Sequence, residues 1–152
     1  MRGLKQFAEY VQERVAYQVT KNNERAKSLT SESARKLSSL HKRLEKLGID
    51  NENANDYVEY CYDIIIHLVR AKMYQDGFSA SGQGAHEAEV AYLRILEFAE
   101  EDVRFADELR YFRNGILYYG TLLDKEYAEK VVAFTKRIYP RLKDIVTKTI
   151  TK

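Results

Sequence analysis

The chain has 152 residues, the usual length of a single domain and enough to bury most of its apolar surface. Hydrophobic residues make up 45% and charged residues 32% of it, which excludes an intrinsically disordered chain. The single Cys61 excludes an internal disulfide and a cysteine-rich zinc site, and its apolar neighbours indicate a buried, inert thiol. With only one Pro and seven Gly, the chain is predicted to be almost entirely helical.

Basic and acidic residues are unevenly distributed along the chain. Residues 1–48 hold eleven basic and five acidic residues, residues 49–108 four and fourteen, and residues 109–152 ten and four. Two interpretations are open. The basic ends attract RNA phosphates, or basic and acidic helices pack against each other within one chain or across a dimer.

The first 47 residues carry two apolar stripes at helical spacing. In residues 3–20 and 25–47 apolar side chains recur three or four positions apart, and the second stripe ends in a leucine seam before Gly48. This pattern predicts either one long helix or a helical hairpin, and the periodicity does not decide between them.

The most apolar segment, residues 52–76, is predicted to be the central helix, with an N-cap at Asp50-Asn51 and Gly77 at its end. Residues 77–84 are rich in Gly and Ser and are predicted to be a flexible loop. A helix over residues 86–99 follows.

A further helix begins near residue 100 and runs to about Gly120. The last helix begins after Asp124, and Pro140 is expected to kink or end it. The fold class is therefore an all-α antiparallel bundle of five or six helices. We expect one domain over residues 1–152, with its core in residues 52–149.

The stretch from Leu109 to Gly120 is the predicted functional surface. Arg110, Asn114 and Tyr118 are spaced four residues apart and share one face of the helix. Such a polar row forms either a phosphate or nucleic-acid site or a polar seam between packed helices. Gly115 inside this helix indicates a close approach by another backbone or by a ligand. The candidate ligand-binding residues are Arg110, Arg113, Asn114, Tyr118 and Tyr119.

Within this stretch, Arg113-Asn114 is followed by three residues and then by Tyr118-Tyr119-Gly120. This arrangement resembles the signature helix of the HEPN family, small all-helical domains of prokaryotic toxin–antitoxin pairs and RNA-processing systems. The Gly-Ala-His-Glu sequence at residues 84–87 is similar to that of one archaeal-like HEPN subgroup. The resemblance implies a four-helix up-and-down core with an extra helix. It is strongest over residues 52–146.

The family's ribonuclease pattern ends in a His, and this chain has Tyr118 at that position. In catalytic members the signature helices of two subunits meet and form a metal-independent RNA-cleaving site. An imidazole accepts a proton near neutral pH, and an arginine stabilises the charge on the scissile phosphate. A phenol holds its proton far more tightly than an imidazole and is a poor general base. The candidate catalytic residues are Arg113, Asn114, Tyr118 and, as a substitute imidazole, His86.

Three functions are open at this point. The first is a non-catalytic binding module, which the resemblance implies to be a homodimer and to bind RNA, a nucleotide or a minimal nucleotidyltransferase in a toxin–antitoxin-like system. The second is a metal-independent ribonuclease that uses Tyr118 or His86 as acid or base. The third is a purely structural dimerisation scaffold. We expect no cofactor, no metal and no membrane segment, and a cytoplasmic location.

Overall fold

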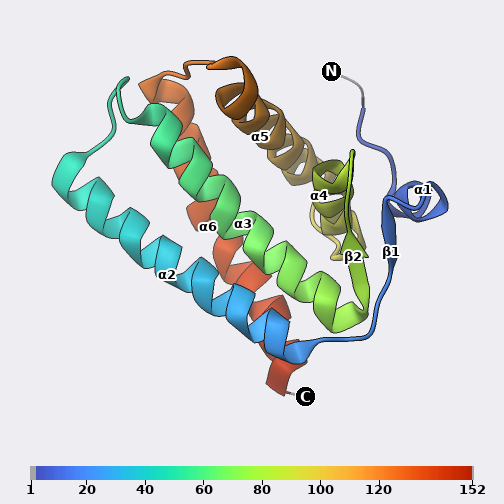
Figure 1. Cartoon of the computed structure of the whole chain (residues 1–152). Helices are drawn as coiled ribbons and strands as arrows, with labels where there is room; N and C mark the ends of the chain where they lie inside the picture. Colours follow the sequence, from blue (N-terminus) through green and yellow to red (C-terminus); the bar gives the residue numbers. More distant parts are fainter. Residues whose placement is uncertain (1–2, 152) are drawn as a thin grey trace.

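The computed structural model describes residues 3–151 and confirms the all-α fold class (Figure 1). Six helices and two short strands are present within these residues: α1 Phe7–Gln12, β1 Ala16–Gln18, α2 Asn23–Leu47, α3 Ala54–Asp76, β2 Phe78–Ala80, α4 Ala85–Ile95, α5 Glu100–Tyr119 and α6 Lys125–Thr151. No helix in the described range combines the length and the hydrophobicity needed to cross a bilayer.

Helix α3 is the centre of the bundle, as its composition predicts. It contacts α2, α4, α5 and α6, and in Figure 1 α4 and α5 lie on the opposite side of it from α2. Ile64, Leu68 and Val69 are fully buried, because apolar side chains occupy nearly every face of the helix. The helix ends at Gly77 in the left-handed conformation (φ +84°), a common helix terminator.

The N-terminal 47 residues differ from both predicted arrangements. Only α2 matches the expected helix; the predicted helix over residues 3–20 stops at Gln12, and residues 16–18 form β1. Arg14 turns the backbone with a φ of +61°. The apolar stripe misled because Phe7 is buried from the short α1, whereas Val15 packs against the core from the bend that precedes β1.

The predicted flexible loop at residues 77–84 contains β2, which pairs antiparallel with β1. The register places Ala16 opposite Ala80 and Gln18 opposite Phe78. This pairing joins segments about sixty residues apart, so local sequence does not reveal it. Phe78 joins this two-stranded ribbon to α1, because its ring lies 5.4 Å from that of Phe7.

The two last helices begin where the sequence predicts. The Asp124 Oδ1 atom accepts a hydrogen bond from the Tyr127 backbone N–H at 2.8 Å, which confirms the predicted cap. Of the two alternatives for Pro140, a kink or a helix end, the structure excludes the end, because α6 continues to Thr151. Pro140 lacks the N–H that would bond the Lys136 carbonyl. Both residues are exposed, so water can satisfy that oxygen.

Candidate functional site

The predicted polar row on α5 does not form one uniform surface. Arg110 is 7% exposed, Asn114 is half-buried, and Tyr118 is 74% exposed. The row therefore runs from the interior of the bundle at Arg110 to open solvent at the end of α5. Its members have different environments and can have different roles.

Arg110 is held inside the bundle by two carboxylates. Its Nε donates to Asp107 Oδ1 at 2.8 Å, and its Nη1 donates to Glu87 Oε1 at 2.9 Å. Asp107 precedes it by one turn of α5, and Glu87 lies in the first turn of α4, so the arginine ties these helices together. A guanidinium that is bonded to two carboxylates has little attraction left for an external anion. The geometry therefore favours the polar seam for Arg110.

Arg113 lies half-buried against α3. Its guanidinium is 5.1 Å from the ring centroid of Tyr62, and its Nη2 is 3.8 Å from Asp63 Oδ1. Asp63 also accepts a hydrogen bond from Lys36 Nζ at 2.9 Å. Because Asp63 is shared with Lys36, it balances the positive charge of Arg113 only in part. The Nε–H of Arg113 is buried and has no acceptor among the described residues.

His86 reaches the same tyrosine as Arg113, from α4. Its ring packs edge-on against Tyr62 with a centroid distance of 6.3 Å. The structure therefore brings the substitute imidazole and the signature arginine to one aromatic ring. Burial raises the pKa of the Tyr62 phenol, whose hydroxyl has no hydrogen-bond partner in the described part of the chain. Tyr62 is accordingly a neutral spacer between the two groups.

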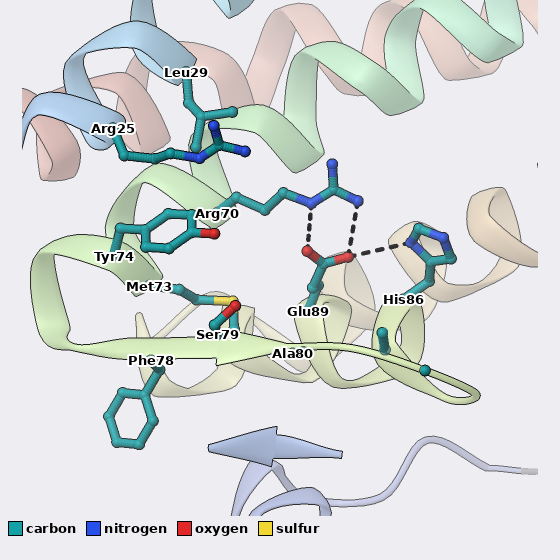
Figure 2. Close-up of a pocket in the computed structure, with 12 residues that line it drawn as sticks. Arg25, Leu29, Arg70, Met73, Tyr74, Phe78, Ser79, Ala80, His86 and Glu89 are labelled. Carbon is teal, nitrogen blue, oxygen red and sulfur yellow. Dashed lines mark hydrogen bonds and ion pairs between the residues drawn. The ribbon is translucent and has the colours of Figure 1, made fainter. Parts of the chain in front are cut away.

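A buried carboxylate fixes the orientation of His86. The Nδ1 atom of His86 is 3.2 Å from Glu89 Oε1, and Glu89 also accepts two hydrogen bonds from the guanidinium of Arg70 (Figure 2). Burial alone would raise the pKa of Glu89, but the bonds from His86 and Arg70 outweigh it and lower that pKa. Glu89 therefore stays ionised and holds both partners.

Four exposed apolar side chains, which we call the terminal patch, lie close together in the sequence at the end of α5. Their exposed fractions are 49% for Leu117, 74% for Tyr118, 86% for Tyr119 and 86% for Leu122. They come from the last turn of the helix and from the connection that follows it. Contact with a partner would remove this apolar area from water.

The turn that presents the terminal patch is fixed by polar contacts from α3. Asn55 Nδ2 donates to the Thr121 carbonyl, and Asn55 Oδ1 accepts from the Leu123 backbone N–H, both at 2.9 Å. No local pattern predicts this role, because the two partners of Asn55 lie 66 and 68 residues away in the sequence. Gly115 is explained here as well: a Cβ atom on it would lie 2.8 Å from Thr121 Oγ1. The close neighbour is the side chain of this turn, and not the other backbone or the ligand that we expected.

The two remaining histidines lie apart from these groups. His41 is exposed on α2. His67 is half-buried on α3, where burial lowers its pKa and its Nδ1 has no hydrogen-bond partner among residues 3–151. In the same range, no cluster of three or more His, Cys, Asp or Glu side chains is arranged to hold a metal ion.

Comparison of the chain with protein-family models, curated proteins and solved structures gave no significant match.

Proposed function

We propose that this protein is a non-catalytic, HEPN-like binding module that forms a homodimer through the terminal patch. The observation that carries this proposal is the exposure of four large apolar side chains at the end of α5, which in Tyr119 and Leu122 reaches 86%. A second copy is the occupant that we favour, because the HEPN resemblance implies that the signature helices of two subunits meet. A two-fold contact would bury the same patch on both copies.

Charge favours a protein partner over RNA at this surface. Arg110 is neutralised by Asp107 and Glu87, and Arg113 faces Asp63. RNA binding depends on uncompensated basic side chains that replace the counterions of the phosphates. The terminal patch offers mainly apolar and aromatic area, which suits a protein interface. The resemblance also leads us to propose a minimal nucleotidyltransferase as a further partner, and co-purification from the native host with mass spectrometry tests this.

The dimer is tested by sedimentation equilibrium of the wild type and of a triple variant, Tyr118→Ser, Tyr119→Ser and Leu122→Ser. We expect a wild-type dimer whose dissociation constant rises at least about a hundredfold in the variant, since buried aromatic anchors contribute more than 1 kcal/mol each. The fold should be unaffected, because all three side chains are exposed.

Ile95→Ser is the matched control for this experiment. Ile95 is 55% exposed and ends α4, near the opposite end of α5. Its replacement should leave the dissociation constant unchanged. A wild type that stays monomeric at the highest soluble concentration, or an equal effect of the control, contradicts the proposed interface.

One observation favours the ribonuclease as a second candidate: His86 and Arg113 contact the same Tyr62. In that reaction the imidazole takes the proton of a ribose 2′-hydroxyl, and the 2′-oxygen attacks the adjacent phosphorus to form a 2′,3′-cyclic phosphate. The P–O5′ bond breaks, and the departing 5′-oxygen receives a proton from the imidazolium. The bond between His86 and Glu89 would orient the imidazole for this step. Arg113 would stabilise the charge on the phosphate.

The two candidates are separated by incubation with structureless RNA. We expect the wild type to leave the RNA intact, and Tyr118→His to introduce cleavage if the site lacks only its imidazole. Cleavage by the wild type that disappears in both Arg113→Ala and His86→Ala would establish the ribonuclease and overturn the non-catalytic proposal. The loss in two separate variants excludes a contaminating nuclease.

A further inference from the structure

A second feature of the molecule lies away from the terminal patch. A cavity of about 360 Å³ opens between the N-terminal part of α2, the C-terminal part of α3, the strand β2 and the start of α4 (Figure 2). Its volume lies at the small end of the range for sites that bind small molecules. Basic and apolar side chains both line the cavity, and each group limits which ligands can bind.

One wall of the cavity is cationic. Arg25 contributes an exposed guanidinium that lies 5.6 Å from the ring centroid of Tyr74 and has no carboxylate partner within the described residues. Arg70 uses Nε and Nη2 to bind Glu89, which leaves its Nη1 atom unused. In Figure 2 the guanidinium of Arg25 extends toward that of Arg70.

The charges on this wall do not balance. Two arginines face one carboxylate, Glu89, so the charges of these three side chains sum to about +1. Two guanidinium groups in one cavity repel each other, and an anion placed between them removes that repulsion. Paired guanidinium groups are well suited to the oxygens of a phosphate or carboxylate.

The rest of the lining is largely apolar. Leu29 follows Arg25 by one turn of α2, Met73 follows Arg70 by one turn of α3, and Ala80 comes from β2. Ser79 adds one hydroxyl group to this lining. These apolar side chains can contact a hydrocarbon or an aromatic ring, which a free inorganic ion lacks. The lining therefore selects a molecule with an acidic headgroup and an apolar body.

We propose that this cavity binds a small organic anion, a phosphate monoester or a carboxylate on an apolar body, through Arg25 and Arg70. The site is separate from the terminal patch and does not depend on the proposed dimer. Arg25 and the Nη1 atom of Arg70 bind the headgroup, and the apolar body lies against Met73 and Leu29. Glu89 sets the strength of binding, because it holds Arg70 in place and offsets one positive charge.

The probes are phenyl phosphate, benzoate and the neutral benzyl alcohol, titrated into the full-length protein and followed by amide chemical shifts. We expect both anions to shift the signals of residues 78–86, and the alcohol to bind at least about tenfold more weakly, because it lacks the charge-assisted bonds. Tighter binding of phenyl phosphate assigns the site to phosphate monoesters, and tighter binding of benzoate assigns it to carboxylates.

The decisive variant is Arg25→Gln, which removes an exposed charge and leaves the core untouched. We expect it to weaken binding of the preferred anion about tenfold. Lys27→Gln is the matched control: it removes the same charge two residues along α2, on another face, and should leave affinity unchanged. Glu89→Gln keeps the shape of the side chain and removes the negative charge, and it should tighten anion binding at least about threefold.

Several outcomes would contradict the proposed site. The first two are equal affinities for the alcohol and the anions, and no binding of any probe at millimolar concentration. The others are chemical-shift changes confined to residues around Arg113, and an equal loss of affinity in Arg25→Gln and Lys27→Gln. A Glu89→Gln protein that folds and binds no more tightly than the wild type also contradicts the charge argument. The dissociation constant of the dimer should be the same for the wild type and for Arg25→Gln. If the cavity proves not to bind anions, the proposed dimeric function is therefore unaffected.

Discussion

Arg110→Met should destabilise the protein by about 3–5 kcal/mol, which makes it one of the two largest effects that we expect. The substitution keeps most of the side-chain volume and removes the guanidinium from between Asp107 and Glu87. Asp107 is 4% exposed, so its carboxylate would be left buried without a partner. The free energy of unfolding from urea denaturation measures the effect.

A matched control and a rescue test the physical cause. Arg104→Met makes the same change on the exposed face of α5 and should alter stability by less than about 0.5 kcal/mol. In Arg110→Met combined with Asp107→Leu, both buried charges are removed, and most of the lost stability should return. If the double variant is no more stable than the single one, the unpaired carboxylate is not the reason for the loss.

Tyr92→Ala should cost about 3–5 kcal/mol, because it removes a fully buried aromatic side chain from α4. The ring of Tyr92 packs at 4.8 Å from Phe7 and at 6.2 Å from Phe78, so it joins α1 and β2 to the bundle. Its hydroxyl donates a hydrogen bond to Asp76 at the end of α3. The loss should appear both in the unfolding free energy and as faster amide hydrogen exchange in β1 and β2.

Two further substitutions divide the contribution of Tyr92 into ring and hydroxyl. Tyr92→Phe retains the packing and removes only the bond to Asp76, so we expect a loss of about 1 kcal/mol. Tyr119→Ala removes a ring that is 86% exposed and should not change the stability of the monomer. If the amides of β1 and β2 exchange at the same rates in Tyr92→Ala as in the wild type, the aromatic cluster does not stabilise the two-stranded ribbon.

The helices could be predicted from sequence because their signals are local. The apolar content of residues 52–76, the leucine seam of α2 and the cap at Asp124 each lie within a few turns of the structure that they specify. Periodicity of this kind depends only on which face of a helix meets the core. The same information placed α3 at the centre of the bundle.

The strand pairing could not be predicted in this way. β1 has three residues, and its partner begins sixty positions later, so neither strand carries a pattern long enough to recognise. The apolar stripe of residues 3–20 contains side chains that pack against the core from two different segments, α1 and the bend before β1. Local periodicity cannot tell that situation from a single helix.

The sequence places Arg110, Asn114 and Tyr118 on one face of a helix, but it could not say which of them are exposed to solvent. Arg110 and Tyr118 lie on one helical face, yet Glu87 on another helix encloses the first and nothing covers the second. The meeting of His86 and Arg113 at Tyr62 likewise depends on three helices. Contacts between side chains of different helices depend on tertiary packing, which cannot be predicted from the local pattern of a single sequence.

The topology around α3 has a consequence for how the chain assembles. α2 and α3 are joined by residues 48–53 alone, so their packing closes a short loop at little entropic cost. α6 packs against the same helix but begins at Lys125, long after α3 ends at Asp76, and its docking must wait for a much longer excursion of the chain. We therefore expect the α2–α3 pair to form first. Until α6 arrives, one apolar side of α3 is open to water, and that interval is when a nascent chain is most exposed to aggregation.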